Sequence, residues 1–358
     1  MKQKHTIKMK SSAAKVRGQG VASAYEEQVA LVKNGLKDKF KVIENQWGRA
    51  DITHFHTVDF WFYLTIPYAK LCGTAIGYVH FLPETMEQSL KLPRIAKKVF
   101  YRYLLRFYKS MDMLVTVNPY FIDRLEANGV PREKVVYIPN FVSQKEFYPL
   151  SAEDKNALRL KYKIPAEKFV VVCAGQLQTR KGIFDFLEIA GRMPDVQFVW
   201  AGGFSFGKIT DGYEKIRKVV ENPPLNVLFT GIVDREQMNE IYNIGDVMFL
   251  PSYEELFPMT VLEAMNCGLP LLLRDMPIYE NILFDYYMRA TDNEGFCREL
   301  DRLRQEAAYY EQAKQASWRG HLFYNEQHVA KMWDEFYSGL MEKEAAGKIK
   351  KRKKSKRA

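Results

Sequence analysis

Between residues 168 and 274 the chain alternates short apolar segments with amphipathic ones, and this alternation constrains the fold more than any other feature. Apolar runs occur at 168–177, 196–203, 226–233, 246–252 and 269–275. Segments with apolar residues at helical spacing separate them, at 182–193, 212–223 and 235–245. Strands that alternate with helices at short spacing are typical of a parallel sheet covered on both faces. The sequence therefore predicts a doubly wound α/β domain in the second half.

The first half of the chain carries a looser version of the same pattern. Strand-like runs lie at 50–58, 74–81, 113–119 and 135–142, and helix-like segments lie at 24–36 and 120–129. A polar stretch that contains Pro149 follows and is the expected linker. We therefore expect an α/β protein of two Rossmann-like, doubly wound parallel-sheet domains that face a cleft, one over 1–143 and one over 144–319.

The end of the chain adds two further segments. A helix-like stretch at about 320–342 is expected to cross back to the first domain, and residues 343–358 are expected to form a disordered basic tail. No apolar run approaches the ~18–20 residues of a membrane-spanning helix, and the first residues lack the apolar centre of a signal peptide. The sequence predicts a soluble protein that at most lies on a membrane surface.

The stretch SYEELFPMTVLEAMNCGLP, residues 252–270, contains two glutamates that point to a ligand site. Pro258 suits the first turn of a helix, so Glu255 is expected in a loop and Glu263 on a helix that ends near Gly268. The neighbours of Glu263 are mostly apolar, and a carboxylate among them requires polar partners. Ligand hydroxyl groups would satisfy it. The alternative, a solvated pair of surface glutamates, fits Glu263 poorly.

Glycines and cations mark other strand ends and helix starts. They are Gly18 and Gly20 before the helix at 24–36, Gly175 after the strand at 168–177, Arg180 and Lys181 before the helix at 182–193, and Gly202 with Gly203. Such places favour an anion, because glycine lets backbone approach a ligand and a helix N-terminus attracts negative charge. The alternatives are an ordinary tight turn at 18–20 and a solvated basic turn at 180–181.

Together these motifs resemble the nucleotide-sugar domain of retaining glycosyltransferases of GT-B fold, the large family that includes sucrose synthase, glycogen synthase and bacterial glycolipid glycosyltransferases. The family pattern reads Gly-Arg-Leu…Lys-Gly, then Gly-x-Gly, then Pro-Ser…Glu-x7-Glu-Ala…Gly-x-Pro. This chain has, in the same order, Gly175, Leu177, Lys181–Gly182, Gly202–Gly203, Pro251–Ser252, Glu255, Glu263–Ala264, Gly268 and Pro270. The first half matches more loosely, through Gly18, Gly20, His56, His80 and the tripeptide IPN at 138–140.

The resemblance implies a UDP-hexose donor and a role for each matching residue. Lys181, assisted by Arg180, would hold the donor diphosphate. Glu255 would bind hydroxyl groups of the transferred hexose, and Glu263 would bind those of the ribose. His80 would line the reaction centre, so His80 and Glu255 are the expected catalytic residues. The glycines at 18, 20, 175 and 203 would let backbone approach the donor.

Enzymes of this family are similar in using no divalent metal, so neither a metal nor a separate cofactor is expected. The chain contains no Asp-x-Asp, and Arg180 and Lys181 would then neutralise the leaving diphosphate. Three positions depart from the family pattern. Gln176 replaces an arginine, and Leu256 and Pro258 replace glycines. Because proline has no N–H, diphosphate contacts from this loop would pass to Met259 or Thr260.

Residues 91–109 combine cations with aromatic residues at helical spacing. The cations are Arg94, Lys97, Lys98, Arg102, Arg106 and Lys109. A basic, aromatic helix suits an anionic membrane surface or the acceptor bound there. A core-packed helix with a solvated basic face is the alternative.

The charge of the chain is unevenly distributed. Residues 1–143 hold 22 Lys and Arg against 12 Asp and Glu, and residues 341–358 hold 9 against 2, so the rest must carry −7 of the total of +10. The first domain and the tail should therefore meet something anionic. Nucleic acid is the other anionic partner, but nothing here resembles an RNA- or DNA-reading fold, so a membrane is favoured.

The details of the first half look closest to Gram-positive hexosyltransferases that add a second sugar to monoglucosyl-diacylglycerol. This narrower resemblance implies a retaining transfer of glucose or galactose to a glycolipid acceptor by a cytoplasmic enzyme at the inner face of the cell membrane. Two alternatives remain open. One is the same chemistry on a soluble polysaccharide or protein, and the other is a non-catalytic, membrane-associated scaffold, which the changes at Gln176, Leu256 and Pro258 would suit.

Overall fold

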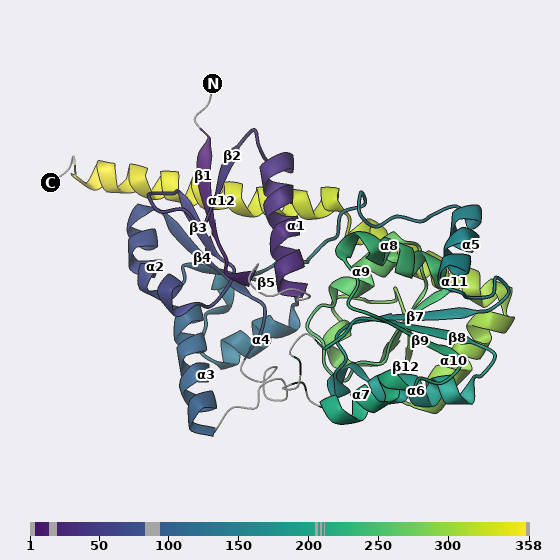
Figure 1. Ribbon diagram of the computed structural model, residues 1–358. Helices are drawn as coiled ribbons and strands as arrows, with labels where there is room; N and C mark the ends of the chain where they lie inside the picture. Colours follow the sequence, from purple (N-terminus) through teal and green to yellow (C-terminus); the bar gives the residue numbers. More distant parts are fainter. Residues whose placement is uncertain are drawn as a thin grey trace.

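The computed structural model of the chain describes residues 4–13, 20–82, 94–204, 207, 210 and 212–355. It contains two lobes, each built around a six-stranded sheet with helices on both sides (Figure 1). The strand orders are β2-β1-β3-β4-β5-β6 and β12-β11-β10-β7-β8-β9, and the paired strands in both sheets are parallel. The predicted fold class of two doubly wound parallel sheets is confirmed.

The first lobe contains the strands and helices from β1 to β6. Its strands are β1 (His5–Lys10), β2 (Phe40–Glu44), β3 (Ile52–Phe55), β4 (Thr74–Val79), β5 (Met113–Thr116) and β6 (Val135–Tyr137). Its helices are α1 (Gly20–Gly35), α2 (Phe60–Cys72), α3 (Arg94–Lys109) and α4 (Tyr120–Ala127). Each apolar run that the sequence marked as a strand in this half is a strand, namely β3, β4, β5 and β6.

The second lobe follows the predicted alternation element by element. Its strands are β7 (Val170–Ala174), β8 (Gln197–Ala201), β9 (Val227–Gly231), β10 (Val247–Leu250), β11 (Leu271–Arg274) and β12 (Met288–Ala290). Its helices are α5 (Ala152–Lys161), α6 (Ile183–Arg192), α7 (Tyr213–Glu221), α8 (Arg235–Ile244), α9 (Met259–Asn266), α10 (Asn293–Gln305) and α11 (Ala307–Phe323). The central strands β7, β10 and β11 are fully buried, which explains their continuous apolar sequences.

The two faces of the first sheet belong to different cores. Alternate residues of a strand point to opposite faces, so Ile7 and Met9 join the core that contains α1, whereas Lys8 and Lys10 face α2. The core on the α1 side continues into the second lobe, and the core on the other side is made by α2, α3 and α4.

The last helix, α12 (Glu326–Ser355), crosses from the second lobe to the first (Figure 1). Trp333 and Tyr337 are buried in the core on the α1 side, and the Tyr337 hydroxyl lies 3.1 Å from the Gln28 amide nitrogen. The helix also continues through residues 343–355, where the sequence predicted a disordered tail. Lysine, arginine, alanine and glutamate favour helix, and this composition extends α12 beyond its packed part. None of the described helices combines the length and apolar composition that crossing a membrane requires.

Candidate functional site

Lys181 and Glu255 form an ion pair at the carboxyl end of β7. Only 14% of the lysine side chain and 6% of the glutamate side chain are exposed. Gly182 makes this contact possible, because it has a φ of 74° and a Cβ there would lie 2.3 Å from the Pro251 carbonyl oxygen. The turn that carries Lys181 is thereby held directly against the segment that carries Glu255.

The neighbouring strand end is held equally closely. Gly202 has a φ of 138°, and a Cβ there would lie 1.9 Å from the carbonyl oxygen of Gly175. The Trp200 indole donates to the same oxygen at 2.9 Å, and the Leu177 N–H donates to the Gly203 carbonyl at 3.1 Å. The glycines that the sequence marked at the ends of β7 and β8 therefore let these two strand ends approach each other. A larger residue at 202 would separate them.

Arg180 directly precedes Lys181 in the same turn. Its guanidinium donates to the Glu254 carbonyl at 3.3 Å, and its own carbonyl accepts from the Tyr253 N–H at 2.8 Å. Both predicted cations thus contact the segment that precedes α9. Gln176, which stands where the family pattern has arginine, accepts a hydrogen bond from Gln178 at 2.8 Å.

Glu263 lies on α9, as predicted, and is 6% exposed. Its polar partners come from the protein: the Tyr242 hydroxyl donates at 2.6 Å and Arg235 forms an ion pair at 3.4 Å. Burial raises the pKa of this carboxyl, and these two contacts oppose the rise. α9 begins at Met259 directly after Pro258, so Met259 and Thr260 form its first turn.

Arg235 was not among the residues that the sequence singled out, yet it joins both lobes. It forms ion pairs with Glu263 on α9, with Glu146 after β6, and with Glu27 on α1. Glu27 is 7% exposed, and burial raises its pKa to about 7 although Arg235 opposes that rise. The sequence offered no signal for this cluster, because its members are brought together only by the packing of α1, α8 and α9.

Asn118 makes a second contact between the lobes. It follows β5, is fully buried, and its side-chain amide donates to the carbonyls of Leu256 and Ile278 at 3.0 Å each. The side chains of Leu256 and Ile278 also pack against the α2–α3–α4 core of the first lobe. Leu256 replaces a family glycine, and here it anchors the loop next to Glu255. The sequence did not single out Asn118, because both of its partners lie on a distant segment of the chain.

His80 directly follows β4, the neighbour of β5, and is 7% exposed. Its ring stacks on Tyr78 with centroids 4.4 Å apart, and Tyr78 also stacks on His54 and His56. Burial lowers the pKa of His80 to about 4, so its imidazole is neutral near pH 7. Its Nε2 is buried without a hydrogen-bond partner among the described residues, which leaves this atom available for a ligand.

The remaining predicted positions lie elsewhere. Gly18 is outside the described residues, and Gly20 is the first residue of α1. α3 begins at Arg94; Lys98, Arg102, Arg106 and Lys109 are exposed along it, and Lys97 is half-buried. Leu104, Phe107 and Tyr108 of the same helix are buried, so α3 has both a packed face and a basic face. In the part of the chain that the structure describes, no group of three or more His, Cys, Asp or Glu residues is arranged to hold a metal ion.

Comparison with known proteins identifies the family. Residues 154–316 match the glycosyl transferases group 1, and residues 32–146 match glycosyltransferase family 4. An alpha-galactosylglucosyldiacylglycerol synthase of Streptococcus pneumoniae is 46% identical over 345 residues, which are 96% of this chain and 91% of that protein. The chain belongs to the group 1 glycosyltransferases.

A second relative of this glycosyltransferase is a processive diacylglycerol alpha-glucosyltransferase of Acholeplasma laidlawii. It is 30% identical over 233 residues, which are 64% of this chain and 69% of that protein. The predicted membership of the family, and with it the assignment of the chain as an enzyme, is confirmed.

Solved structures of low sequence identity share the fold of the glycosyltransferase. Sucrose-phosphate synthase from Thermosynechococcus elongatus has a TM-score of 0.76 at 16% identity, over 94% of this chain and 99% of that chain. Anabaena HepE in complex with UDP-glucose has a TM-score of 0.71 at 14% identity, over 94% of this chain and 100% of that chain. The GT-B arrangement of two doubly wound sheets is therefore common to all three.

Proposed function

We propose that this glycosyltransferase moves glucose or galactose from a UDP-sugar to a glycolipid acceptor such as monoglucosyl-diacylglycerol, with retention at the anomeric carbon. It would act at the cytoplasmic face of the cell membrane. The Streptococcus pneumoniae relative supports the acceptor, because it is named for a galactosylglucosyl-diacylglycerol product and matches nearly the whole chain. The Acholeplasma laidlawii relative is named for a diacylglycerol acceptor as well.

The observation that carries the donor side is the buried ion pair of Lys181 and Glu255. A cation and an acceptor carboxylate are what a sugar diphosphate requires, since the diphosphate is anionic and the hexose presents hydroxyl donors. When the donor binds, Lys181 would turn to the diphosphate, with Arg180 beside it, and Glu255 would accept hydrogen bonds from the hexose. The pair would thus exchange a contact with each other for two contacts with the donor.

Glu263 would bind the ribose hydroxyls of UDP. Its carboxylate already accepts from Tyr242 and Arg235, and each carboxylate oxygen can accept more than one hydrogen bond. These partners fix the orientation of the carboxylate before the donor arrives. The first turn of α9, with Met259 and Thr260, would offer its N–H groups to the diphosphate, because first-turn N–H groups lack partners within a helix.

The chemistry requires stabilisation of the leaving diphosphate and a polar group near the anomeric carbon. Arg180 and Lys181 would neutralise the developing charge, so the proposed reaction needs no divalent metal. His80 would line the reaction centre, and its neutral ring can donate or accept one hydrogen bond at Nε2. Asn118 follows the neighbouring strand and holds the loop of Glu255 against the first lobe.

The surface of α2 and α3 supports action at a membrane. Neither helix contains an Asp or Glu, and α3 carries six Lys or Arg. The two helices pack together, with the rings of Tyr63 and Tyr103 5.6 Å apart. Exposed apolar residues on this surface are Phe60, Trp61, Leu64 and Leu71 of α2 and Ile95 and Val99 of α3. Apolar side chains flanked by cations suit the interface of an anionic bilayer.

A transfer assay tests the reaction. The full chain is incubated with radiolabelled UDP-glucose or UDP-galactose and monoglucosyl-diacylglycerol, and the lipid products are separated and analysed by NMR for the anomeric configuration. A labelled diglycosyl lipid with the α-configuration of the donor is expected. Transfer to a soluble sugar or peptide but to no lipid would refute the lipid acceptor, and failure to bind UDP in calorimetry would favour a non-catalytic scaffold.

Vesicle flotation tests the membrane surface. Replacing Arg102 and Arg106 by Gln should weaken binding to anionic vesicles at low salt, since each exposed cation near such a surface contributes about 1 kcal/mol. The matched control replaces Arg192 and Arg298 by Gln, two exposed arginines of the second lobe. Equal binding by the two double variants would remove α3 from the proposed surface.

A further inference from the structure

Two lysines on β1 are buried in a position that the transfer reaction does not use. Lys8 is 4% exposed and Lys10 is 7% exposed. They are two residues apart on one strand, so both side chains leave the sheet on the same side, toward α2. Lysine is almost never fully buried unless it is paired.

Neither ammonium group has a carboxylate partner among the described residues. The Lys8 ammonium donates to the carbonyl oxygen of Gly48, and the Lys10 nitrogen lies 5.1 Å from the centre of the Trp47 ring and 5.6 Å from that of Phe62. Burial lowers the pKa of both lysines, and the charge of Lys8 lowers that of Lys10 further. Two adjacent ammonium groups without a counter-anion are unfavourable, and a bound anion would relieve both.

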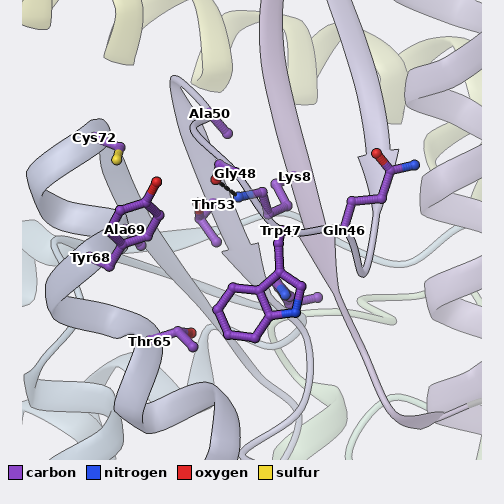
Figure 2. A pocket seen from close by; sticks show the side chains of 11 residues that line it. Lys8, Gln46, Trp47, Gly48, Ala50, Thr53, Thr65, Tyr68, Ala69 and Cys72 are labelled. Carbon is purple, nitrogen blue, oxygen red and sulfur yellow. Dashed lines mark hydrogen bonds between the residues drawn. The ribbon is translucent and has the colours of Figure 1, made fainter.

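The lysines line a small cavity between β1, the loop after β2 and helix α2 (Figure 2). Thr53, Thr65 and Tyr68 add hydroxyl groups to its wall, and among the described residues no carboxylate lines it. The cavity holds about 20 Å³, which is room for one water-sized group. Its exposed rim includes Trp47, which is 79% exposed, and Tyr68, which is 45% exposed.

We propose that this cavity binds one anionic oxygen of a phosphate group, with the rest of the phosphate at the rim. The size argues for this mode of binding, because a whole phosphate is larger than the enclosed space, whereas one of its oxygens fits it. The two cations and the neighbouring hydroxyls are the groups that bind phosphate elsewhere in proteins. We call it the β1 phosphate site, defined by Lys8, Lys10, Trp47, Thr65 and Tyr68.

The surroundings of the site favour a phospholipid headgroup as the source of the phosphate. Tyr68 and Thr65 lie on α2, and the same helix exposes Trp61, Leu64 and Leu71. A phosphodiester at the rim would place its acyl chains along this apolar surface. Free inorganic phosphate has the same chemistry and is the other source. Neither case depends on the proposed glycolipid acceptor, which carries no charge.

The first experiment measures the binding of inorganic phosphate through the change that it causes in the melting temperature of the protein. The ionic strength is held constant, and UDP is present in excess to occupy the donor site. The variants are Lys8→Met and Lys10→Met, which keep the length of the side chain and remove the charge. The control is Lys41→Met, an exposed lysine on the neighbouring strand β2. Loss of one charged hydrogen bond should raise the dissociation constant for phosphate roughly ten-fold in the two site variants and leave the control unchanged.

The second experiment compares flotation with phosphatidylglycerol and phosphatidylcholine vesicles at about 1 M salt. The Debye length is then about 3 Å, so exposed α3 contacts are screened whereas a contact inside the cavity is not. Preferential binding to phosphatidylglycerol that both site variants lose and Lys41→Met keeps identifies the lipid as the source. A phosphate effect that is lost in both variants, without a vesicle effect, identifies free phosphate.

Two results would overturn the site. One is site variants that behave like Lys41→Met in both experiments, which would mean that the lysines remain buried without an anion. The other result is needed if the Met variants do not fold. In that case the site is refuted when the wild-type protein neither responds to phosphate nor prefers phosphatidylglycerol at high salt. Lys10→Arg, which keeps the charge, should retain binding and so separates loss of charge from loss of packing.

Discussion

Lys181 and Glu255 are 74 residues apart in the chain, yet their side chains form an ion pair that is nearly closed to solvent. We expect Lys181→Met and Glu255→Gln each to lower kcat/KM at least about 100-fold, because each removes a proposed contact with the donor. Each should also lower the free energy of unfolding by on the order of 3 kcal/mol, since it leaves a buried charge unpaired.

The double variant separates these two effects. Lys181→Met combined with Glu255→Gln should recover most of the stability but none of the activity, as measured by chemical denaturation and by the transfer assay. The exposed pair of Arg192 and Glu188 is the control, and replacing both should change the stability by less than about 1 kcal/mol. Full activity in either single variant would contradict the donor assignment of that residue.

Arg235 should govern the affinity for UDP without contacting the acceptor. Arg235→Met leaves Glu263 with Tyr242 as its remaining side-chain partner among the described residues, so the carboxylate is no longer fixed for the ribose. We expect the dissociation constant for UDP in calorimetry to rise roughly ten-fold. Arg298→Met, at an exposed ion pair on α10, should bind UDP like the wild type. Unchanged affinity in Arg235→Met would show that Glu263 needs no support from Arg235.

Asn118→Ala should weaken the connection between the two lobes. The substitution leaves the carbonyls of Leu256 and Ile278 without this donor, which costs about 1–3 kcal/mol of the free energy of unfolding. Because Leu256 adjoins Glu255, KM for the UDP-sugar should rise as well. Asn128→Ala removes an exposed amide contact at the end of α4 and serves as the control. An unchanged KM in the Asn118→Ala enzyme would show that Asn118 is not needed to position the loop of Glu255.

His56 makes the stability sensitive to acid. Burial, together with the nearby rings of His54 and His80, holds the pKa of His56 well below its usual 6.5. At a pH between the lowered pKa of the folded state and the ordinary pKa of 6.5 in the unfolded state, the unfolded chain binds a proton that the folded chain does not. The free energy of unfolding therefore falls as the pH drops below about 6.5, and His56 does not affect it above that pH. The loss approaches about 1.4 kcal/mol per pH unit for one proton.

Replacing His56 by Phe isolates this contribution. The variant should lose less stability than the wild type between pH 6.5 and pH 5, as measured by denaturant titration at each pH. The comparison with the wild type is essential because Glu27 changes the stability in the opposite direction. The pKa of Glu27 is raised to about 7, so its contribution to the free energy of unfolding is present at low pH and is lost as the pH rises through that value. Identical pH dependence in the two proteins would show that His56 does not carry the effect.

The sequence predicted the fold because the determinants of the strands are local. Short apolar runs followed by glycine at a strand end need no knowledge of distant residues, and β7 and β8 lie where these runs predict. The same holds for the residues near the donor site. Lys181 and Glu255 were marked by their places at strand ends, and parallel strands bring such ends to one edge of a sheet.

The residues that the sequence did not mark depend on packing between distant segments. Arg235 and Asn118 connect the two lobes, and the residues next to them in the sequence do not indicate which distant residues they contact. Lys8 and Lys10 were missed for a different reason. Lysine is common on the exposed face of a strand, so the sequence does not distinguish these two from exposed lysines. The positions of α2 and Trp47 show that they are buried.

The path of α12 also makes the first lobe dependent on a segment that follows the second lobe in the chain. Trp333 and Tyr337 fill the core beside His54 and α1, so α12 supplies part of the interior of the first lobe. Residues 5–137 taken alone would lack these two side chains and would expose apolar surface that is buried in the whole chain. The two lobes are therefore not independent modules, and dividing the enzyme at the segment that joins them would leave the core of its N-terminal half incomplete.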